Sequence, residues 1–256
     1  MNDWNPQSYL KFSDERTLPS ADLAARIKID RPAGIIDIGC GPGNSTRILK
    51  ERWPGASITG LDNSPSMIER AKKEYPVMKW VLADAARIRP DVKYDIVFSN
   101  AAIQWIPDHE RLIPVFFEMV KKGGALAVQT PMFKDMPLNR AIVRTAASKK
   151  WAGYTHSCGG LFTYHDAGFY YGILAGRAAG IEMWETSYIH VFGSCADLIE
   201  WSRSTAMMPY LNALPSDGLK KEFEAELLEE CRREYPPQPD GNVLFPVRRL
   251  FFIAYG

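Results

Sequence analysis

The sequence predicts an α/β protein with a doubly wound, seven-stranded, mostly parallel sheet and added helical segments. Short apolar runs alternate with helix-period segments through the first half of the chain, as in parallel strands joined by right-handed crossovers. Two further strand-like runs come late, after long helical stretches. The seven expected strands cover residues 34–39, 57–62, 78–84, 94–100, 124–130, 182–192 and 247–255.

Local sequence features predict each strand and helix of the first half. The run "GIIDIG" at 34–39 is short and apolar, which is typical of a buried strand, and residues 45–53 carry an apolar stripe at helical spacing. Ser64 is the expected N-cap of the next helix, because a serine hydroxyl can accept a hydrogen bond from a free backbone amide. Pro65 then fits the first helical turn, where its missing N–H costs nothing.

We expect one domain covering residues 1–256. The second half is rich in helix and loop patterns and shows no low-complexity linker. The expected parts are an N-terminal helical lid at 1–30, a cofactor-binding core at 31–130, helical substrate-cap insertions at 131–180 and 195–240, and closing strands at 182–192 and 247–255.

Composition excludes several classes of protein. The net charge is +1 with 46% hydrophobic residues, so neither nucleic acid nor a membrane is indicated as a partner. Four scattered cysteines without a CxxC pair argue against a metal site and favour a reducing compartment. The N-terminus lacks signal-peptide features. We expect a cytoplasmic protein and, since no long heptad repeat is present, a monomer.

The stretch "DIGCGPGNST" at 37–46 predicts a ligand loop at the end of the first strand. Gly39, Gly41 and Gly43 alternate there and would let a ligand approach the bare backbone. A dinucleotide fingerprint beginning at Gly39 would need glycine at position 44, where Asn44 stands. A purely structural turn is the remaining alternative.

Two aspartates follow the next two strands. Asp62 ends the second strand about 20 residues after the loop, where an acidic residue can accept ribose hydroxyls. Asp84 ends the third strand. Taken singly, Asp62 could be a helix cap and Asp84 a turn residue. Together with the loop they place three ligand-facing features on the carboxyl edge of the sheet, where such folds bind ligands.

The glycine loop, with Asp37 two residues before Gly39, resembles motif I of class I S-adenosylmethionine (SAM)-dependent methyltransferases. Within that class the chain resembles the trans-aconitate 2-methyltransferases. The segments that carry the resemblance are "DWNPQSYLKFSDER", "DIGCGPGNST", "GLDNSPSMI", "NAAIQWIPDH", "LAVQTP" and "FPVRRLFFIA". It implies a Rossmann-like fold, SAM as cofactor, S-adenosylhomocysteine as product, and methylation of a small anionic carboxylic acid to a monomethyl ester.

The resemblance also implies a set of cofactor contacts along the carboxyl edge. The loop would pack against the methionyl part and ribose, and Asp84 would face the adenine amino group. The implied residues are Asp37, Gly39, Cys40, Gly41, Gly43, Asp62, Asn63, Asp84, Ala85 and Asn100.

For the substrate, the resemblance places residues 99–104 beside the reactive methyl. We expect Gln104, Trp105, Tyr9 and Arg16 to bind the acid, although Trp105 could equally be a core side chain. Trp4 and Phe12 would form an apolar lid. A tricarboxylate needs arginine forks and hydroxyl donors. Further candidates are Arg144, Arg203, Arg248, Arg249, Tyr154, Tyr164, Tyr170 and Tyr210.

The expected chemistry needs no general base and no metal, because a carboxylate is already ionised at neutral pH. We therefore expect no catalytic residue in the strict sense and structural roles for His109, His156, His165 and His190. Met208 stands where the related enzymes can carry a basic residue, so a different or smaller acid is an alternative. Others are methyl transfer to carbon or nitrogen, a nicotinamide oxidoreductase, and a non-catalytic SAM-binding module.

Overall fold

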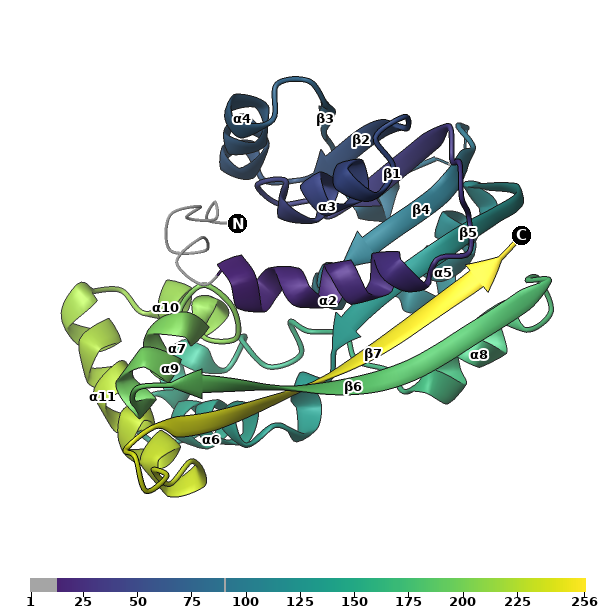
Figure 1. The fold of residues 1–256 in the computed structure, drawn as a ribbon. Coiled ribbons are helices and arrows are strands. Elements are labelled where there is room, and N and C mark those ends of the chain that lie inside the picture. Colours follow the sequence, from purple (N-terminus) through teal and green to yellow (C-terminus); the bar gives the residue numbers. More distant parts are fainter. Residues whose placement is uncertain (1–12, 90) are drawn as a thin grey trace.

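The computed structural model describes residues 13–89 and 91–256, with side chains from residue 17 onward except at position 135. Its sheet has seven strands in the order β3-β2-β1-β4-β5-β7-β6 (Figure 1). The first five pair in parallel and β7 runs antiparallel to both neighbours, which confirms the predicted fold class. The strands are β1 Gly34–Ile38, β2 Ser57–Asp62, β3 Lys79–Leu82, β4 Tyr94–Asn100, β5 Val120–Pro131, β6 Gly180–Phe192 and β7 Val243–Tyr255.

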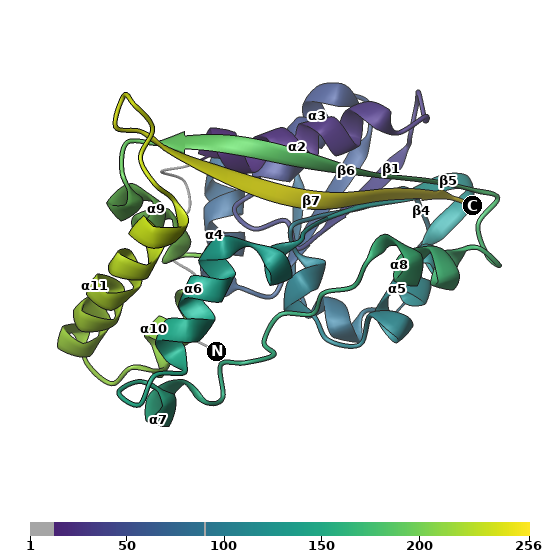
Figure 2. The same ribbon diagram turned by 90° about the horizontal axis from the view of Figure 1, so that it is seen from below.

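Helices cover both faces of the sheet. The α-helices are α2 Ser13–Arg26, α3 Asn44–Arg52, α4 Pro65–Glu74, α5 His109–Glu118, α6 Pro137–Ala146, α7 Ala152–Thr155, α8 Ala167–Leu174, α9 Cys195–Ser202, α10 Met208–Ala213 and α11 Asp217–Glu234. Short 3₁₀ turns are η1 Ala85–Arg87, η2 Ile103–Trp105 and η3 Phe133–Asp135. Figure 2 shows α2 and α3 on one side of the sheet and α5 and α8 on the other.

Alternation along the strands divides the core into two layers. On the α2 side, Leu23 of α2 and Leu49 of α3 pack with Phe98 and Phe251 of the sheet. On the other side, side chains of α5 and α8 pack against alternate residues of the same strands. Because successive strand residues point to opposite faces, both layers come from the same continuous apolar runs. The predicted cap of α4 is also present, since the Ser64 Oγ accepts from the Met67 amide at 3.3 Å.

The β6–β7 pair continues beyond the rest of the sheet. Strand β7 pairs with β5 only from Arg249 to Tyr255, while its pairing with β6 extends back to Val243. Helices α6, α7, α9, α10 and α11 form a second core against this extension (Figure 1). Trp151 and Phe223 are fully buried there, and the Trp151 indole donates to the Glu226 carboxylate at 2.6 Å. We call this second body, built on the β6–β7 extension, the cap.

The predicted extent of the cap and the predicted bounds of five strands differ from the structure, β1 and β6 by only one or two residues. Residues 131–180 do not all belong to the cap, because Tyr170 and Leu174 of α8 are buried in the layer beside α5. Strand β7 begins at Val243 rather than 247, since the cap core buries alternate residues of its first half. Strand β3 is shorter than expected and β5 is longer.

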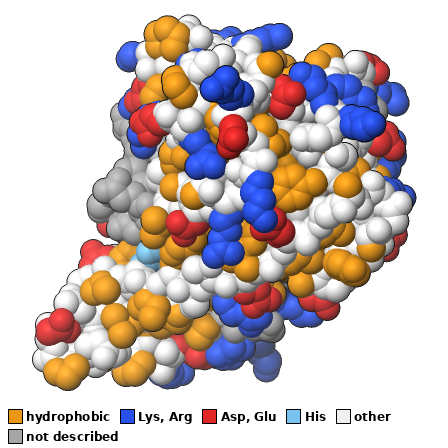
Figure 3. All heavy atoms as spheres, turned by 45° about the vertical axis from the view of Figure 1, so that its right-hand side comes forward, with side chains coloured by type: hydrophobic (Ala, Val, Ile, Leu, Met, Phe, Trp, Pro, Cys, Tyr) orange, Lys and Arg blue, Asp and Glu red, His pale blue; other side chains and the backbone are white. Residues whose placement is uncertain are grey.

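Charged side chains of both signs share one face of the described structure (Figure 3). Figure 3 shows basic and acidic side chains interspersed over one face of the molecule, in keeping with the net charge of +1. Among the helices of the described ranges, none combines the length and apolar character needed to cross a membrane.

Candidate functional site

The glycine loop between β1 and α3 is shaped for close approach. Gly39, Gly41 and Gly43 have φ values of 74°, 55° and 98°, a region that side-chain-bearing residues rarely adopt. A Cβ on Gly39 would lie 2.2 Å from the Ala102 Cβ, and one on Gly43 would lie 2.8 Å from Trp80. A Cβ on Gly41 would meet nothing within 4 Å. Gly39 and Gly43 are thus required by packing, whereas Gly41 leaves its backbone open to a ligand.

Asp37 lies behind the loop and holds the start of α3. Its Oδ2 accepts hydrogen bonds from the hydroxyls of Ser45 and Thr46, both at 2.7 Å. Its Oδ1 is buried and has no hydrogen-bond partner in the described structure. Burial raises the pKa of Asp37 to about 6, although the two hydroxyls oppose the shift. Asp37 is therefore ionised at neutral pH, and its Oδ1 bonds to none of the described residues.

Asp62 braces the loop from the end of β2. Its Oδ2 accepts from the Gly41 amide at 2.8 Å and its Oδ1 accepts from the Ser64 amide at 2.9 Å. The capping of α4 comes from Ser64 itself, so Asp62 is more than a helix cap. A carboxylate has about four acceptor positions, and ribose hydroxyls can still bind to it.

The remaining predicted cofactor residues differ in exposure. Asp84 caps η1 through the Ala86 amide at 3.0 Å and is 44% exposed, so the turn role accounts for part of its placement. Asn63 is exposed, whereas Ala85 and Cys40 are buried. Burial also raises the pKa of the Cys40 thiol, which keeps it neutral beside Asp37 and Asp62.

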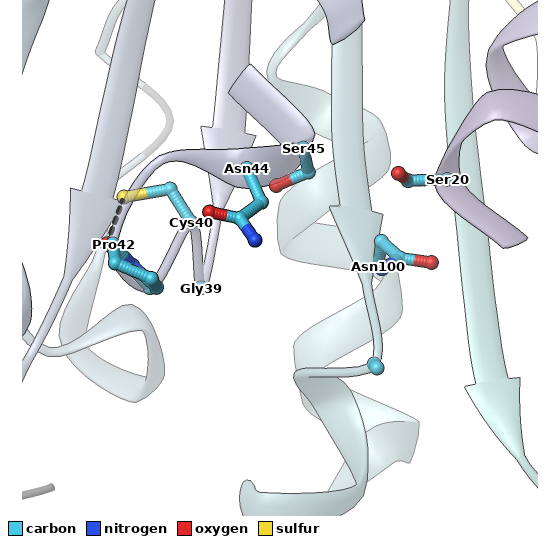
Figure 4. Close-up of a pocket in the computed structure, with 9 residues that line it drawn as sticks. Ser20, Gly39, Cys40, Pro42, Asn44, Ser45 and Asn100 are labelled. Carbon is cyan, nitrogen blue, oxygen red and sulfur yellow. Dashed lines mark hydrogen bonds between the residues drawn. The ribbon is translucent and has the colours of Figure 1, made fainter. Parts of the chain in front are cut away.

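A small hollow lies between the glycine loop and the end of β4 (Figure 4). Its lining residues are Ser20, Gly39, Cys40, Gly41, Pro42, Asn44, Ser45, Asn100 and Ala101. The loop forms one wall, and Asn100 and Ser20 lie across from it. Within the part of the chain that the structure describes, the buried Asn100 Oδ1 has no hydrogen-bond partner. Ser20 was not predicted as a site residue, because nothing in the sequence of α2 marks which of its polar residues faces the sheet.

Three segments meet beyond the end of β4. The Ala101 amide donates to the Gln129 carbonyl at 3.0 Å, and the Gln104 Nε2 donates to the Ala101 carbonyl at 2.7 Å. The Thr163 amide in turn donates to the Gln104 carbonyl at 2.9 Å. These bonds join the end of β5, the turn after β4 and the loop before α8. We call this junction the seam.

Trp105 forms part of an aromatic wall at the seam. Its ring lies 4.5 Å from that of Phe162, which is stacked at 5.8 Å on Tyr164. Phe133 approaches Phe162 edge-on at 6.4 Å. The core interpretation of Trp105 therefore explains its packing, and its role as a substrate contact stays a prediction.

Several buried polar atoms around the seam have no hydrogen-bond partner in the described structure. A buried polar group left unsatisfied costs about 1–3 kcal/mol, so each of these atoms is a candidate for a hydrogen bond to a ligand. The atoms are Gln104 Oε1, Gln129 Nε2, Thr130 Oγ1 and Tyr164 OH. Of these residues, Gln104 was a predicted site residue and Tyr164 a candidate.

Most candidate arginines are engaged in exposed ion pairs. Arg144 binds Glu230 and Glu234, Arg203 binds Glu224, and Arg248 binds Glu185. Arg249 differs, because it is buried and its Nη1 donates to the Gln129 Oε1 at 3.3 Å.

The tyrosines predicted to bind the substrate also differ in exposure and bonding. Tyr154 is exposed, Tyr210 is buried, and the Tyr170 hydroxyl is bonded to His109. Tyr9, Trp4 and Phe12 lie outside the described residues. The backbone of Arg16 lies in α2, but its side chain is outside the described part, so its predicted role is not tested.

His109 joins α5, α8 and η2. Its Nδ1 lies 2.8 Å from the Tyr170 hydroxyl and its Nε2 lies 2.8 Å from the Ile103 carbonyl. A carbonyl can only accept, so Nε2 carries the proton and Nδ1 accepts from Tyr170. Burial lowers the pKa of His109, which favours this neutral form. In the described ranges no group of three or more potential metal ligands occurs.

Comparison with known proteins agrees with this geometry. Residues 35–124 match the family model described as "Methyltransferase domain". The structure also resembles Haemonchus contortus phosphoethanolamine N-methyltransferase 2 in complex with S-adenosyl-L-methionine. That match has a TM-score of 0.59 at 15% identity, over 96% of this chain and 56% of the other. The fold and loop define a class I SAM-dependent methyltransferase.

Relatives in sequence place the chain more narrowly. It is 39% identical to the trans-aconitate 2-methyltransferase of Azoarcus sp. (strain BH72), over 99% of both chains. It is 40% identical to the protein of that name from Methylobacterium radiotolerans, over 99% of this chain and 98% of the other. The chain belongs to the trans-aconitate 2-methyltransferase family.

Proposed function

We propose that this protein transfers a methyl group from SAM to a carboxylate of trans-aconitate, giving a monomethyl ester and S-adenosylhomocysteine. The observation that carries the proposal is the identity of 39% over 99% of both chains with a relative of that name. The open backbone at Gly41 and the unsatisfied atoms at the seam are compatible with the same activity, since a ligand could approach the one and bond to the others.

The cofactor would lie along the carboxyl edge of the sheet. Gly41 lets it approach the backbone, Asp62 accepts its ribose hydroxyls, and the Asn100 Oδ1 and Asp37 Oδ1 are acceptors suited to a cationic amino group. When bound, SAM supplies a methyl group on a positively charged sulfur. The alternating glycines and the end-of-strand acids leave the edge fitted to a nucleoside of this kind.

The protein's part in the reaction is to bind and orient. A carboxylate oxygen is already ionised, so no proton has to be removed before it attacks. The one buried histidine beside η2 has both ring nitrogens engaged, at 2.8 Å each, and neither is available as a base. Holding the two reactants in line and excluding water are the main sources of acceleration for such a displacement.

The direct test is methyl transfer from labelled SAM to a panel of acids: trans-aconitate, its cis isomer, citrate and isocitrate. We expect label on trans-aconitate that base releases as volatile methanol, because only an ester behaves in this way. Base-stable label would indicate transfer to carbon or nitrogen. Preference for a different acid would support the alternative suggested by Met208, which opens α10.

We further infer that the protein works as a monomer in the cytoplasm. All four cysteines are buried free thiols, which suits a reducing compartment. Light scattering after size-exclusion chromatography tests the oligomeric state, and a mass of two chains would contradict it.

A further inference from the structure

Ser20 occupies a position of α2 at which packing favours an apolar residue. Leu23, Ala24 and Ile27 follow it at the spacing of one helical face, and each is at most 2% exposed. Ser20 itself is 1% exposed. Its hydroxyl donates to the Thr17 carbonyl at 2.7 Å, a bond to the helix's own backbone that slightly destabilises a helix. An alanine would complete this face without burying a hydroxyl, so helix packing alone does not account for the serine.

The Ser20 side chain reaches the hollow beside the glycine loop. The Ser20 Oγ points from α2 toward the loop, and the Asn100 side chain enters the same space from the end of β4 (Figure 4). The hollow has a volume of about 40 Å³, which is room for a group little larger than a water molecule. It can therefore hold the polar head of a ligand but not a ring.

The oxygens around the hollow are acceptors whose protons are already committed elsewhere. A carbonyl can only accept, so the Ser20 proton is directed to Thr17 and the lone pairs of Oγ remain. The Ser45 hydroxyl likewise donates to the Asp37 Oδ2 at 2.7 Å. The Asn100 Oδ1 bonds to none of the described residues. Because Asp37 is ionised at neutral pH, this set of oxygens favours a cation with several N–H donors over an anion.

We propose that Ser20 is a cofactor-binding residue whose hydroxyl oxygen accepts a hydrogen bond from the α-ammonium group of SAM. This inference rests on the cofactor of the proposed function and not on its acid substrate. An ammonium group has three donors, so it can bond to Ser20 and Asn100 together. A carboxylate in the same place would meet lone pairs from both sides. Asn44, at the start of α3, can donate or accept and so suits either group of the ligand.

Ser202 in the cap provides a matched control. Its hydroxyl also donates to the carbonyl three residues earlier, that of Ile199, at 2.8 Å. The residue is fully buried, and its helix α9 packs in the cap core. Ser202→Ala therefore makes the same chemical change in the same helical setting, away from the glycine loop.

The test is calorimetric titration with three adenosine thioethers. They are S-adenosylhomocysteine, its decarboxylated analogue, which keeps the amino group, and its deaminated analogue, which keeps the carboxylate. We expect Ser20→Ala to weaken the two amino-bearing ligands about tenfold, as loss of a hydrogen bond to a charged group does, and the deaminated analogue by less than about twofold. Ser202→Ala should leave all three affinities unchanged. An equal loss for all three ligands, or no loss for S-adenosylhomocysteine, would overturn the contact.

The wild-type protein offers a measurement that does not depend on how a variant folds. We expect it to bind the deaminated analogue at least about tenfold more weakly than S-adenosylhomocysteine, because the acceptors around the hollow then face no donor. Equal affinity for these two ligands would reject the ammonium subsite. Denaturant unfolding of Ser20→Ala should give a midpoint equal to that of the wild type or slightly higher, because alanine is the better helix former.

Failure of this contact and failure of the proposed function are distinguishable. If S-adenosylhomocysteine binds through Ser20 but no methyl group reaches any acid, the function falls and the contact stands. If trans-aconitate is methylated while Ser20→Ala binds all three ligands like the wild type, the contact falls and the function stands.

Discussion

The cofactor edge and the seam are built in different ways, although they lie next to each other. The cofactor edge is formed mainly by backbone. It consists of three glycines with positive φ and one carboxylate that accepts a hydrogen bond from a loop amide. At the seam, buried side chains from distant segments meet, as Gln129 and Arg249 do across 120 positions of sequence. A site formed by backbone can be recognised from a short stretch of sequence, because the glycines it needs are close together. A site made of side chains depends on strand register.

The largest effect should separate two glycines of the same loop. Gly39→Ala should destabilise the fold by about 2–5 kcal/mol, because it adds left-handed strain and a clash with Ala102. Gly41→Ala should cost only about 1–2 kcal/mol of stability, since open space faces it, yet it should block the cofactor. Denaturant unfolding and SAM titration of both variants measure this. Equal stability losses would contradict the assignment of Gly41 as the ligand-facing position.

Asp62→Ala should weaken SAM binding by a few kcal/mol at most, on the order of one set of charge-assisted hydrogen bonds. The mutation also frees the Gly41 amide, to which Asp62 is bonded at 2.8 Å. Asp62→Asn is the control that keeps an acceptor for that amide. An unchanged SAM affinity by calorimetry in both variants would show that the cofactor alignment is wrong.

Two tyrosines near the seam test which buried hydroxyls serve the fold and which serve the substrate. Tyr170→Phe should destabilise the fold by about 1–3 kcal/mol, because it leaves the His109 Nδ1 without its donor. Tyr164→Phe removes a hydroxyl that bonds to none of the described residues, so stability should be unchanged or slightly higher. If that hydroxyl serves the substrate, KM for the acid should rise several-fold. A destabilised Tyr164→Phe with unchanged KM would assign the hydroxyl to the fold alone.

The smallest effect concerns pH. Burial lowers the pKa of His109 in the folded protein, so its contribution to stability is present above its unfolded pKa of about 6.5. It is lost as the pH falls through the lower folded value. His109→Gln should therefore cost less stability at about pH 5.5 than at about pH 8. A cost that grows on acidification would mean that the folded protein holds His109 in its charged form.

The sequence allowed the sheet and the glycine loop to be predicted, because apolar periodicity and the Gly39-Gly41-Gly43 spacing are local. It did not show that α8 belongs to the core, since its glycine- and aromatic-rich run fits either layer. Nor did it separate Arg249 from Arg248. One residue's shift in a strand reverses the face, and only the pairing of Arg249 with Pro131 decides which arginine is buried.

The most direct measurement is the pH dependence of kcat/KM for methyl transfer to trans-aconitate between about pH 7 and about pH 9. The proposed reaction uses an acceptor that is already ionised, so we expect a flat profile over this range. A rise of about tenfold per pH unit through neutrality would contradict it. Such a slope would show that a proton must leave before the methyl is transferred, and that the acceptor is not a carboxylate.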